Sequence, residues 1–73
     1  MAEQTTIVLS EDEALILFEW LHDVGEKPPP GSAEWVVAHN IICILESALA
    51  APFSSNYDAI LAAARSRVQQ EIF

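Results

Sequence analysis

Two pairs of side chains in this sequence have the spacing of metal ligands on a helix. Glu19 and His22 are three residues apart, so a carboxylate and an imidazole would share one helical face. His39 and Cys43 are four residues apart and could bind one zinc ion together. Neither pair has the further ligands of a complete site within this chain. A metal-binding module would have to be assembled across a homodimer, and we expect no metal or cofactor in one chain.

Catalytic motifs are also missing from the sequence. With two glycines and one cysteine, a phosphate-binding glycine loop and an internal disulfide are both excluded. No GxSxG motif is present, and most serines stand where a helix needs a cap. We therefore expect a non-enzymatic protein with no catalytic residues. The lone cysteine and the absence of a leader or an apolar run long enough to span a membrane predict a cytoplasmic protein.

The chain is organised around the stretch from Glu13 to Val24, in which eight of twelve residues are apolar. A helix here has more apolar surface than one stripe needs, so it should pack on two sides. The stripe expected to face the core consists of Ala14, Leu17, Phe18, Leu21 and Val24. A second stripe contains Ile16 and Trp20, with Leu15 beside it, and predicts contact with another protein or a homodimer through these residues.

Cap and turn residues divide the chain into three helices at about residues 11–24, 33–50 and 56–70. Ser10 and Glu13 form a capping box before the first helix, and Gly25 is typical of the C′ position that ends it. Ser32 should cap the second helix and Ser54 or Ser55 the third. The prediction is an all-α, three-helix bundle-like domain over residues 1–73.

The two segments with the fewest charges carry further expectations. Residues 33–50 contain only Glu34 and Glu46 as charged residues, so we expect this helix to be central and buried on more than one side. Residues 5–9, TTIVL, are rich in β-branched residues and should form a short extended N-terminal arm. The arm is expected to pack along the helices or to pair with its copy in a dimer.

Charge limits the kind of partner. Eleven acidic residues against three basic ones give a net charge of −8, and residues 1–34 alone sum to −7. Such a field repels nucleic acid and anionic membranes and attracts a basic protein, as in an immunity or antitoxin-like inhibitor or a regulator. Mimicry of nucleic acid by the acidic half is a further hypothesis. The expected binding surface consists of Glu11, Asp12, Glu13, Glu19, Trp20 and Asp23.

The order of several short motifs resembles a group of short bacterial proteins of unassigned function. The motifs are LSEDEAL at residues 9–15, FEWL at 18–21, LE at 45–46, PFS at 52–54 with Tyr57, and LAAAR at 61–65. These are caps, turns and core positions, so the resemblance implies a fold and carries no functional residue. The three prolines at 28–30 depart from the pattern.

Overall fold

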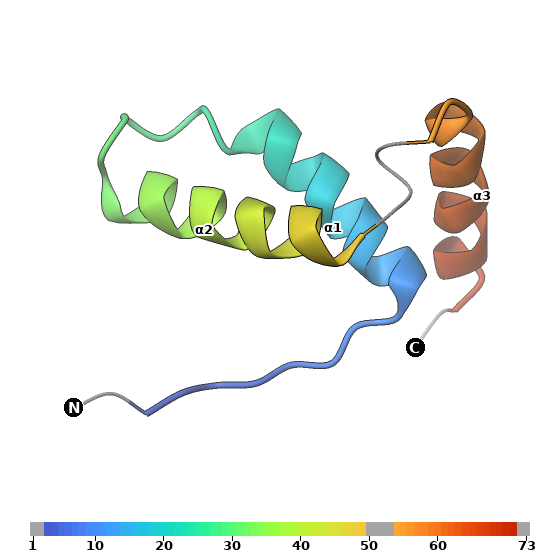
Figure 1. Ribbon diagram of the computed structural model, residues 1–73, viewed down its shortest axis with the longest axis horizontal. Helices are drawn as coiled ribbons and strands as arrows, with labels where there is room; N and C mark the ends of the chain where they lie inside the picture. Colours follow the sequence, from blue (N-terminus) through green and yellow to red (C-terminus); the bar gives the residue numbers. More distant parts are fainter. Residues whose placement is uncertain (1–2, 50–53, 72–73) are drawn as a thin grey trace.

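The computed structural model describes residues 3–49 and 54–71. Helix α1 spans Glu11–Val24, α2 spans Ala33–Ala48 and α3 spans Tyr57–Gln69, after an extended N-terminal arm (Figure 1). The predicted all-α, three-helix fold with an extended arm is confirmed. The second helix ends earlier than predicted, at Ala48, and the predicted end at residue 50 lies outside the described residues.

Helix α1 begins at the predicted capping box. The backbone N–H of Ser10 donates to Glu13 Oε1 at 2.9 Å, and the N–H of Glu13 donates to Ser10 Oγ at 3.1 Å. Two donors that the first turn would leave unsatisfied are therefore paired. Because Ser10 has an extended backbone, φ −66° and ψ 162°, the box also sets the direction in which the arm leaves the helix.

Gly25 ends α1, but for a different reason from the one predicted. A C′ glycine usually has positive φ, whereas Gly25 has φ −69°. A Cβ atom at Gly25 would lie 2.5 Å from the carbonyl oxygen of Leu21, so the position requires glycine because the backbone approaches too closely for a side chain. The positive φ of this turn is at Gly31, 87°.

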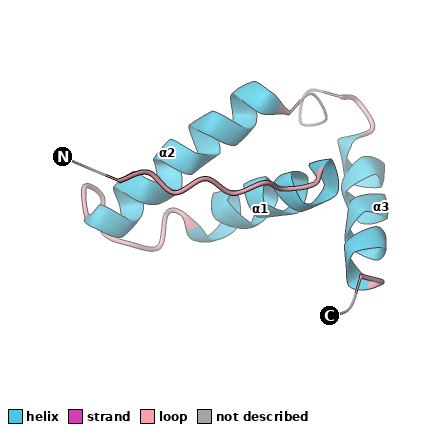
Figure 2. Ribbon diagram, turned by 90° about the horizontal axis from the view of Figure 1, so that it is seen from below, coloured by secondary structure: helices cyan, strands magenta, loops and turns pink. Residues whose placement is uncertain are grey.

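The core lies around α1, which packs against both other helices. Helices α1 and α2 lie side by side in antiparallel orientation, and α3 crosses the end where α1 begins (Figure 2). Leu15, predicted to lie beside the second stripe with Ile16 and Trp20, is 3% exposed and is buried within the core. The prediction that α1 packs on two sides accounts for this position, because a helix with two partners buries a wider face. The buried hydrophobic residues are Leu15, Phe18, Leu21, Ile42, Leu45, Leu49, Leu61 and Ala64.

The prediction that the second helix is central and buried on more than one side was wrong. Ile42 and Leu45 face the core, but Val37 and Ile44 are exposed. Among the described residues the main helix partner of α2 is α1, so one apolar face of α2 stays uncovered. Low charge indicated correctly that this helix is hydrophobic, and it could not indicate how many neighbours the helix has.

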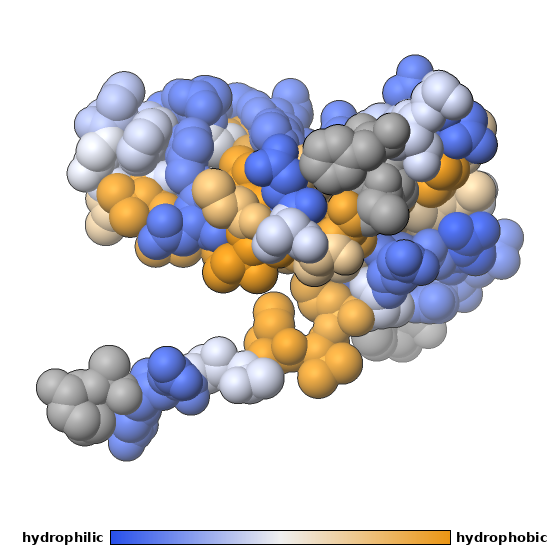
Figure 3. Space-filling view, viewed as in Figure 1, coloured by the Kyte–Doolittle hydropathy of each residue, from blue (hydrophilic) through white to orange (hydrophobic). Residues whose placement is uncertain are grey.

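Two local expectations also need correction. Neither Ser54 nor Ser55 caps α3; Asn56 occupies the N-cap position, and its carbonyl oxygen accepts from the N–H groups of Ala59 and Ile60, each at 3.1 Å. The arm does not pack along the helices, because Ile7 and Val8 are exposed. Figure 3 shows it projecting from the body as a separate extension.

Candidate functional site

A pocket of about 630 Å³ lies between α1 and α3. Its wall on α1 is set by helical spacing, because Ile16, Trp20 and Asp23 recur on one face at intervals of four and three residues. Trp20 is 58% exposed, so most of its indole is open to solvent beside the pocket. The lining residues are Ile16, Glu19, Trp20, His22, Asp23 and Arg65. The pocket thus combines an open aromatic ring with two carboxylates.

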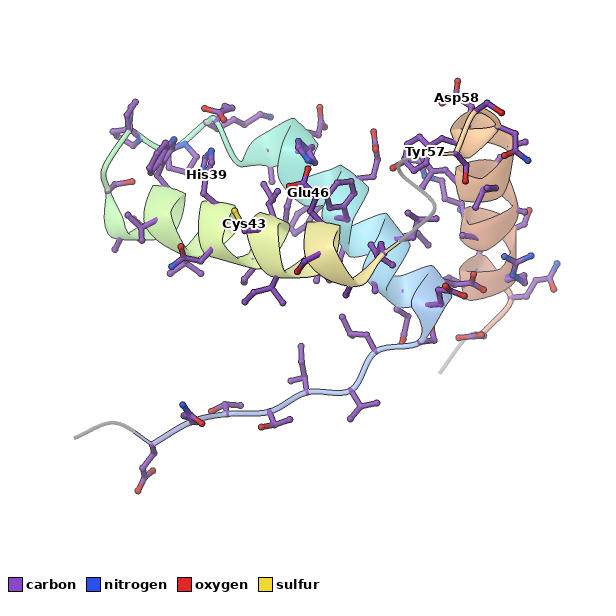
Figure 4. All side chains as sticks on the ribbon, in the orientation of Figure 1. His39, Cys43, Glu46, Tyr57 and Asp58 are labelled. Carbon is purple, nitrogen blue, oxygen red and sulfur yellow. The ribbon has the colours of Figure 1, made fainter. Side chains whose placement is uncertain are left out.

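Glu19 is held in place by the first residue of α3. Tyr57 Oη donates a hydrogen bond of 2.6 Å to Glu19 Oε1, joining residues 38 positions apart in the sequence. Burial and the adjacent Glu19 carboxylate raise the pKa of Tyr57 well above its usual range, so the phenol stays protonated and keeps donating. Figure 4 shows Tyr57 at the start of α3. This bond orients the Glu19 carboxylate and ties the two walls of the pocket together.

Asp12 is also engaged by α3, near the opposite end of that helix. Arg67 Nε donates to Asp12 Oδ2 at 2.7 Å and Arg67 Nη2 donates to Asp12 Oδ1 at 2.9 Å, a two-pronged ion pair. The hydrogen bond from Arg67 lowers the pKa of the Asp12 carboxyl, and the same bond raises the pKa of Arg67. Together with the bond between Tyr57 and Glu19, this pair ties α3 to α1 at two points.

The six predicted binding residues therefore fall into two groups. Glu19, Trp20 and Asp23 lie together at the pocket. The other three, Glu11, Asp12 and Glu13, lie in the first turn of α1, where Glu13 completes the capping box and Asp12 pairs with Arg67. Glu11 is exposed and forms no side-chain hydrogen bond within the described part of the chain. The acidic start of α1 thus contributes to the fold and to the overall charge more than to the pocket.

Arg65 was missed as a site residue. It was expected on the outer face of the third helix, and it is exposed, but it also lines the pocket. Within residues 3–49 and 54–71 it forms no ion pair. Nothing in the sequence indicates that this face of α3 lies next to α1, because the angle between two helices is set by the whole core.

The proposed metal pairs are engaged in other contacts. His39 Nδ1 donates to the carbonyl oxygen of Trp35 at 2.8 Å, and Nε2 lies 2.9 Å from Glu26 Oε2. Both ring nitrogens of His39 are therefore occupied, while Cys43 is an exposed free thiol. Figure 4 shows His39 and Cys43 on the edge of α2 that faces away from the arm. In the described ranges no group of three or more candidate ligands comes together.

Glu19 and His22, the other proposed metal pair, also contact other residues of the same chain. Glu19 accepts from Tyr57, and the ring of His22 packs edge-on against Phe18 with centroids 4.6 Å apart and an interplanar angle of 75°. A carboxylate and an imidazole are both present at the pocket, but each already has a neighbour in the same chain. A shared metal ion would have to displace the Tyr57 hydrogen bond.

The contact between Glu26 and His39 predicts a pH-dependent contribution to stability. Both nitrogens of His39 can donate only when the ring is protonated, so the Trp35 carbonyl and then Glu26 raise its pKa above 6.5. The His39 hydrogen bond lowers the pKa of Glu26 below 4.5. The Glu26–His39 contact should stabilise the folded chain fully between pH 4.5 and pH 6.5, the ordinary pKa values of the two groups. This stabilisation should be lost as the pH rises through the raised pKa of His39 or falls through the lowered pKa of Glu26.

Urea unfolding of Glu26→Gln measures this effect. The difference in free energy of unfolding from the wild type should be largest at about pH 5.5 and should shrink towards about pH 8.5. Glu34→Gln is the matched control, since it removes the same charge from an exposed carboxylate with no contact to histidine among the described residues. A difference that is the same at both pH values would contradict the assigned contact.

Comparisons with known proteins do not assign a role to this chain. None of the helices in the described ranges is long and apolar enough to cross a membrane. Comparison with models of protein families, with curated proteins and with solved structures gave no match. The resemblance to short bacterial proteins therefore stays a prediction, and the geometry of the α1–α3 pocket is the basis for a function.

Proposed function

We propose that this chain is a small, non-enzymatic cytoplasmic protein that acts by contact with a basic protein, and that the α1–α3 pocket receives a lysine or arginine side chain. The observation that carries this proposal is the exposed indole of Trp20 between two carboxylates, Glu19 and Asp23. An aliphatic stem would lie on the ring, and the charged end would reach Asp23.

Two interactions support the binding of a lysine or arginine side chain in the pocket. A cation over an indole face gains about 0.5–2 kcal/mol, and tryptophan is among the residues that contribute most at protein interfaces. The net charge of −8 adds long-range attraction, which speeds association with a basic partner more than it tightens the final complex. Arg65 also lines the pocket, and its positive charge would favour an approach that keeps the incoming cation closer to Asp23 than to Arg65.

The described residues that line the pocket include no serine, cysteine, threonine or lysine that could serve as an activated hydroxyl, thiol or amine nucleophile. Glu19 already accepts a hydrogen bond from Tyr57, which leaves this carboxylate poorly placed to move a proton. Inhibition or regulation by occlusion is the mode of action that fits. An immunity- or antitoxin-like inhibitor of a basic protein is one form of this proposal.

A homodimer through α1 is less well supported as a use of the same residues. Ile16 is already packed against the core, so it offers little of its surface to a second chain. Two copies joined at Trp20 would also bring both sets of Glu19 and Asp23 together, which costs electrostatic energy. A metal module across such a dimer would need the same approach of like charges.

Asp23→Asn should weaken binding of a labelled oligo-arginine peptide, measured by fluorescence anisotropy at low salt. The expected loss is about fivefold, or about 1 kcal/mol, the upper range for an exposed ion pair. Glu11→Gln removes the same charge from the same helix outside the pocket, so it should change the affinity much less. Equal losses for the two variants would mean that the peptide senses net charge alone, and the pocket would lose its assigned role.

A further inference from the structure

A second unpartnered surface lies on the N-terminal arm and on α2, outside the α1–α3 pocket. Six of the seven large hydrophobic residues that are exposed among the described residues lie on the arm and on α2. Those with the largest exposed fractions are Val8 at 93%, Ile7 at 69%, Ile44 at 65% and Val37 at 55%. Monomeric proteins seldom leave so much apolar surface gathered in two neighbouring segments.

An apolar stripe on α2 contains two exposed residues, Val37 and Ile44. Ile41 lies between them on the same face, at four and three residues, and is partly buried against the core. At its start this stripe borders an apolar groove of about 350 Å³ between the end of α1 and the beginning of α2. The groove is lined by Leu21, Ala33, Glu34, Val37, Ala38 and Ile41. Figure 3 shows apolar surface along the edge of α2 that faces the arm.

We propose that a second copy of this chain covers the stripe, and that the arm of each copy packs along α2 of the other. The arm does not cover its own α2, because Ile7 and Val8 are exposed although the capping box at Ser10 holds the base of the arm. In Figures 1 and 2 the arm extends beside the α1–α2 pair without joining it. An arm exchanged between two copies would cover both the apolar residues of the arm and the apolar stripe on α2.

The areas agree with a dimer. A compact protein of 8.0 kDa should expose roughly 4,450 Å², whereas this chain exposes 5677 Å². The excess of roughly 1,200 Å² exceeds the about 800 Å² that each partner contributes to an interface of standard size. The excess surface is therefore enough for one stable self-contact.

Charge and spacing also favour a second copy as the occupant. Residues 4–9 carry no charge and α2 carries only Glu34 and Glu46, so these surfaces can meet without the repulsion that a net charge of −8 imposes elsewhere. In an extended arm Ile7 and Leu9 point to one side about 6.7 Å apart. Val37 and Ile41 are separated by about 6 Å along the helix axis, so the two apolar pairs match in spacing.

Light scattering of the full-length chain across a dilution series tests the dimer. The wild type should have a molar mass close to twice the 8.0 kDa of one chain. Ile7→Lys and Val37→Glu, each at an exposed position, should separately reduce the mass to that of one chain while helical circular dichroism is unchanged. Trp20→Ala, which removes an exposed aromatic from α1, should leave the dimer intact.

Mixing the two variants tests the exchange itself. A mixed dimer has one intact arm–α2 contact and one contact between the introduced lysine and glutamate, so the mass should return to that of a dimer. A mixture that stays monomeric would contradict the exchange. A monomeric wild type, or a dimer dissociated by Trp20→Ala and not by Val37→Glu, would overturn the proposal.

Discussion

Phe18→Ala is expected to leave much of the chain unfolded. Phe18 is 5% exposed and belongs to the core cluster, which also contains residues of α2 and α3. Truncation of a buried phenylalanine to alanine typically costs about 3–5 kcal/mol, including the cavity that remains. The whole stability of a chain of 73 residues is only about 4–11 kcal/mol.

The same helix supplies a matched control. Trp20→Ala removes a larger aromatic side chain two residues away, but that side chain is 58% exposed. It should change the free energy of unfolding by less than about 1 kcal/mol, the usual range for an exposed position. Urea unfolding followed by circular dichroism compares the two variants. Similar losses for both would mean that α1 is rotated about its axis relative to the arrangement described above.

Trp20→Ala should instead have its large effect on binding. If the indole is the platform for a lysine or arginine side chain, its loss removes the cation–π contact and the apolar surface under the stem. We expect the affinity for the oligo-arginine peptide to fall about thirtyfold, which corresponds to about 2 kcal/mol, the threshold for a residue that dominates an interface.

Trp20→Phe separates an aromatic contact from a general change in the pocket. Phenylalanine keeps a ring at the same position with a weaker quadrupole, so a partial loss is expected. Fluorescence anisotropy of the labelled peptide measures all three proteins under the same salt conditions. An affinity that is unchanged in Trp20→Ala would remove the pocket from the proposed function, even if binding depended on salt.

The local features of the fold could be predicted from the sequence because they depend on neighbouring residues. Ser10 and Glu13 indicated the start of α1, and Ser32 indicated the start of α2, where its hydroxyl accepts from the N–H of Trp35 at 3.3 Å. The number of helices and the extended arm followed from the same short-range patterns. Gly25 was identified as the end of α1 although its backbone conformation differs from the one expected.

The arrangement of the helices depends on contacts between distant residues, which the sequence pattern does not encode locally. The apolar stripe at Val37 and Ile44 indicated a face that needs a cover, and we assigned that cover to the rest of the monomer. In the structure α1, with more charges, is the helix that has two partners. Apolar content predicts that a face seeks contact, and it does not identify the contact.

In the candidate site, too, some residues could be identified from the sequence and others only from the packing of the helices. Trp20 was identified because it is an aromatic residue of the second apolar stripe, and Asp23 because it belongs to the acidic half of the chain. Arg65 and Tyr57 could not be identified, because their roles arise only where α3 meets α1. Asp12 and Glu13 were expected to face a partner, and they are engaged in an ion pair and a helix cap instead.

The most direct test of the central claim is a nuclear magnetic resonance titration of the isotope-labelled chain with the oligo-arginine peptide. If the pocket binds a basic side chain, the indole N–H of Trp20 and the backbone N–H groups of Asp23 and Arg65 should shift most. Resonances at Glu34 and Glu46, which are acidic and do not line the pocket, should move little. Shifts of equal size at all exposed acidic residues, or an unaffected Trp20, would contradict a specific site between α1 and α3.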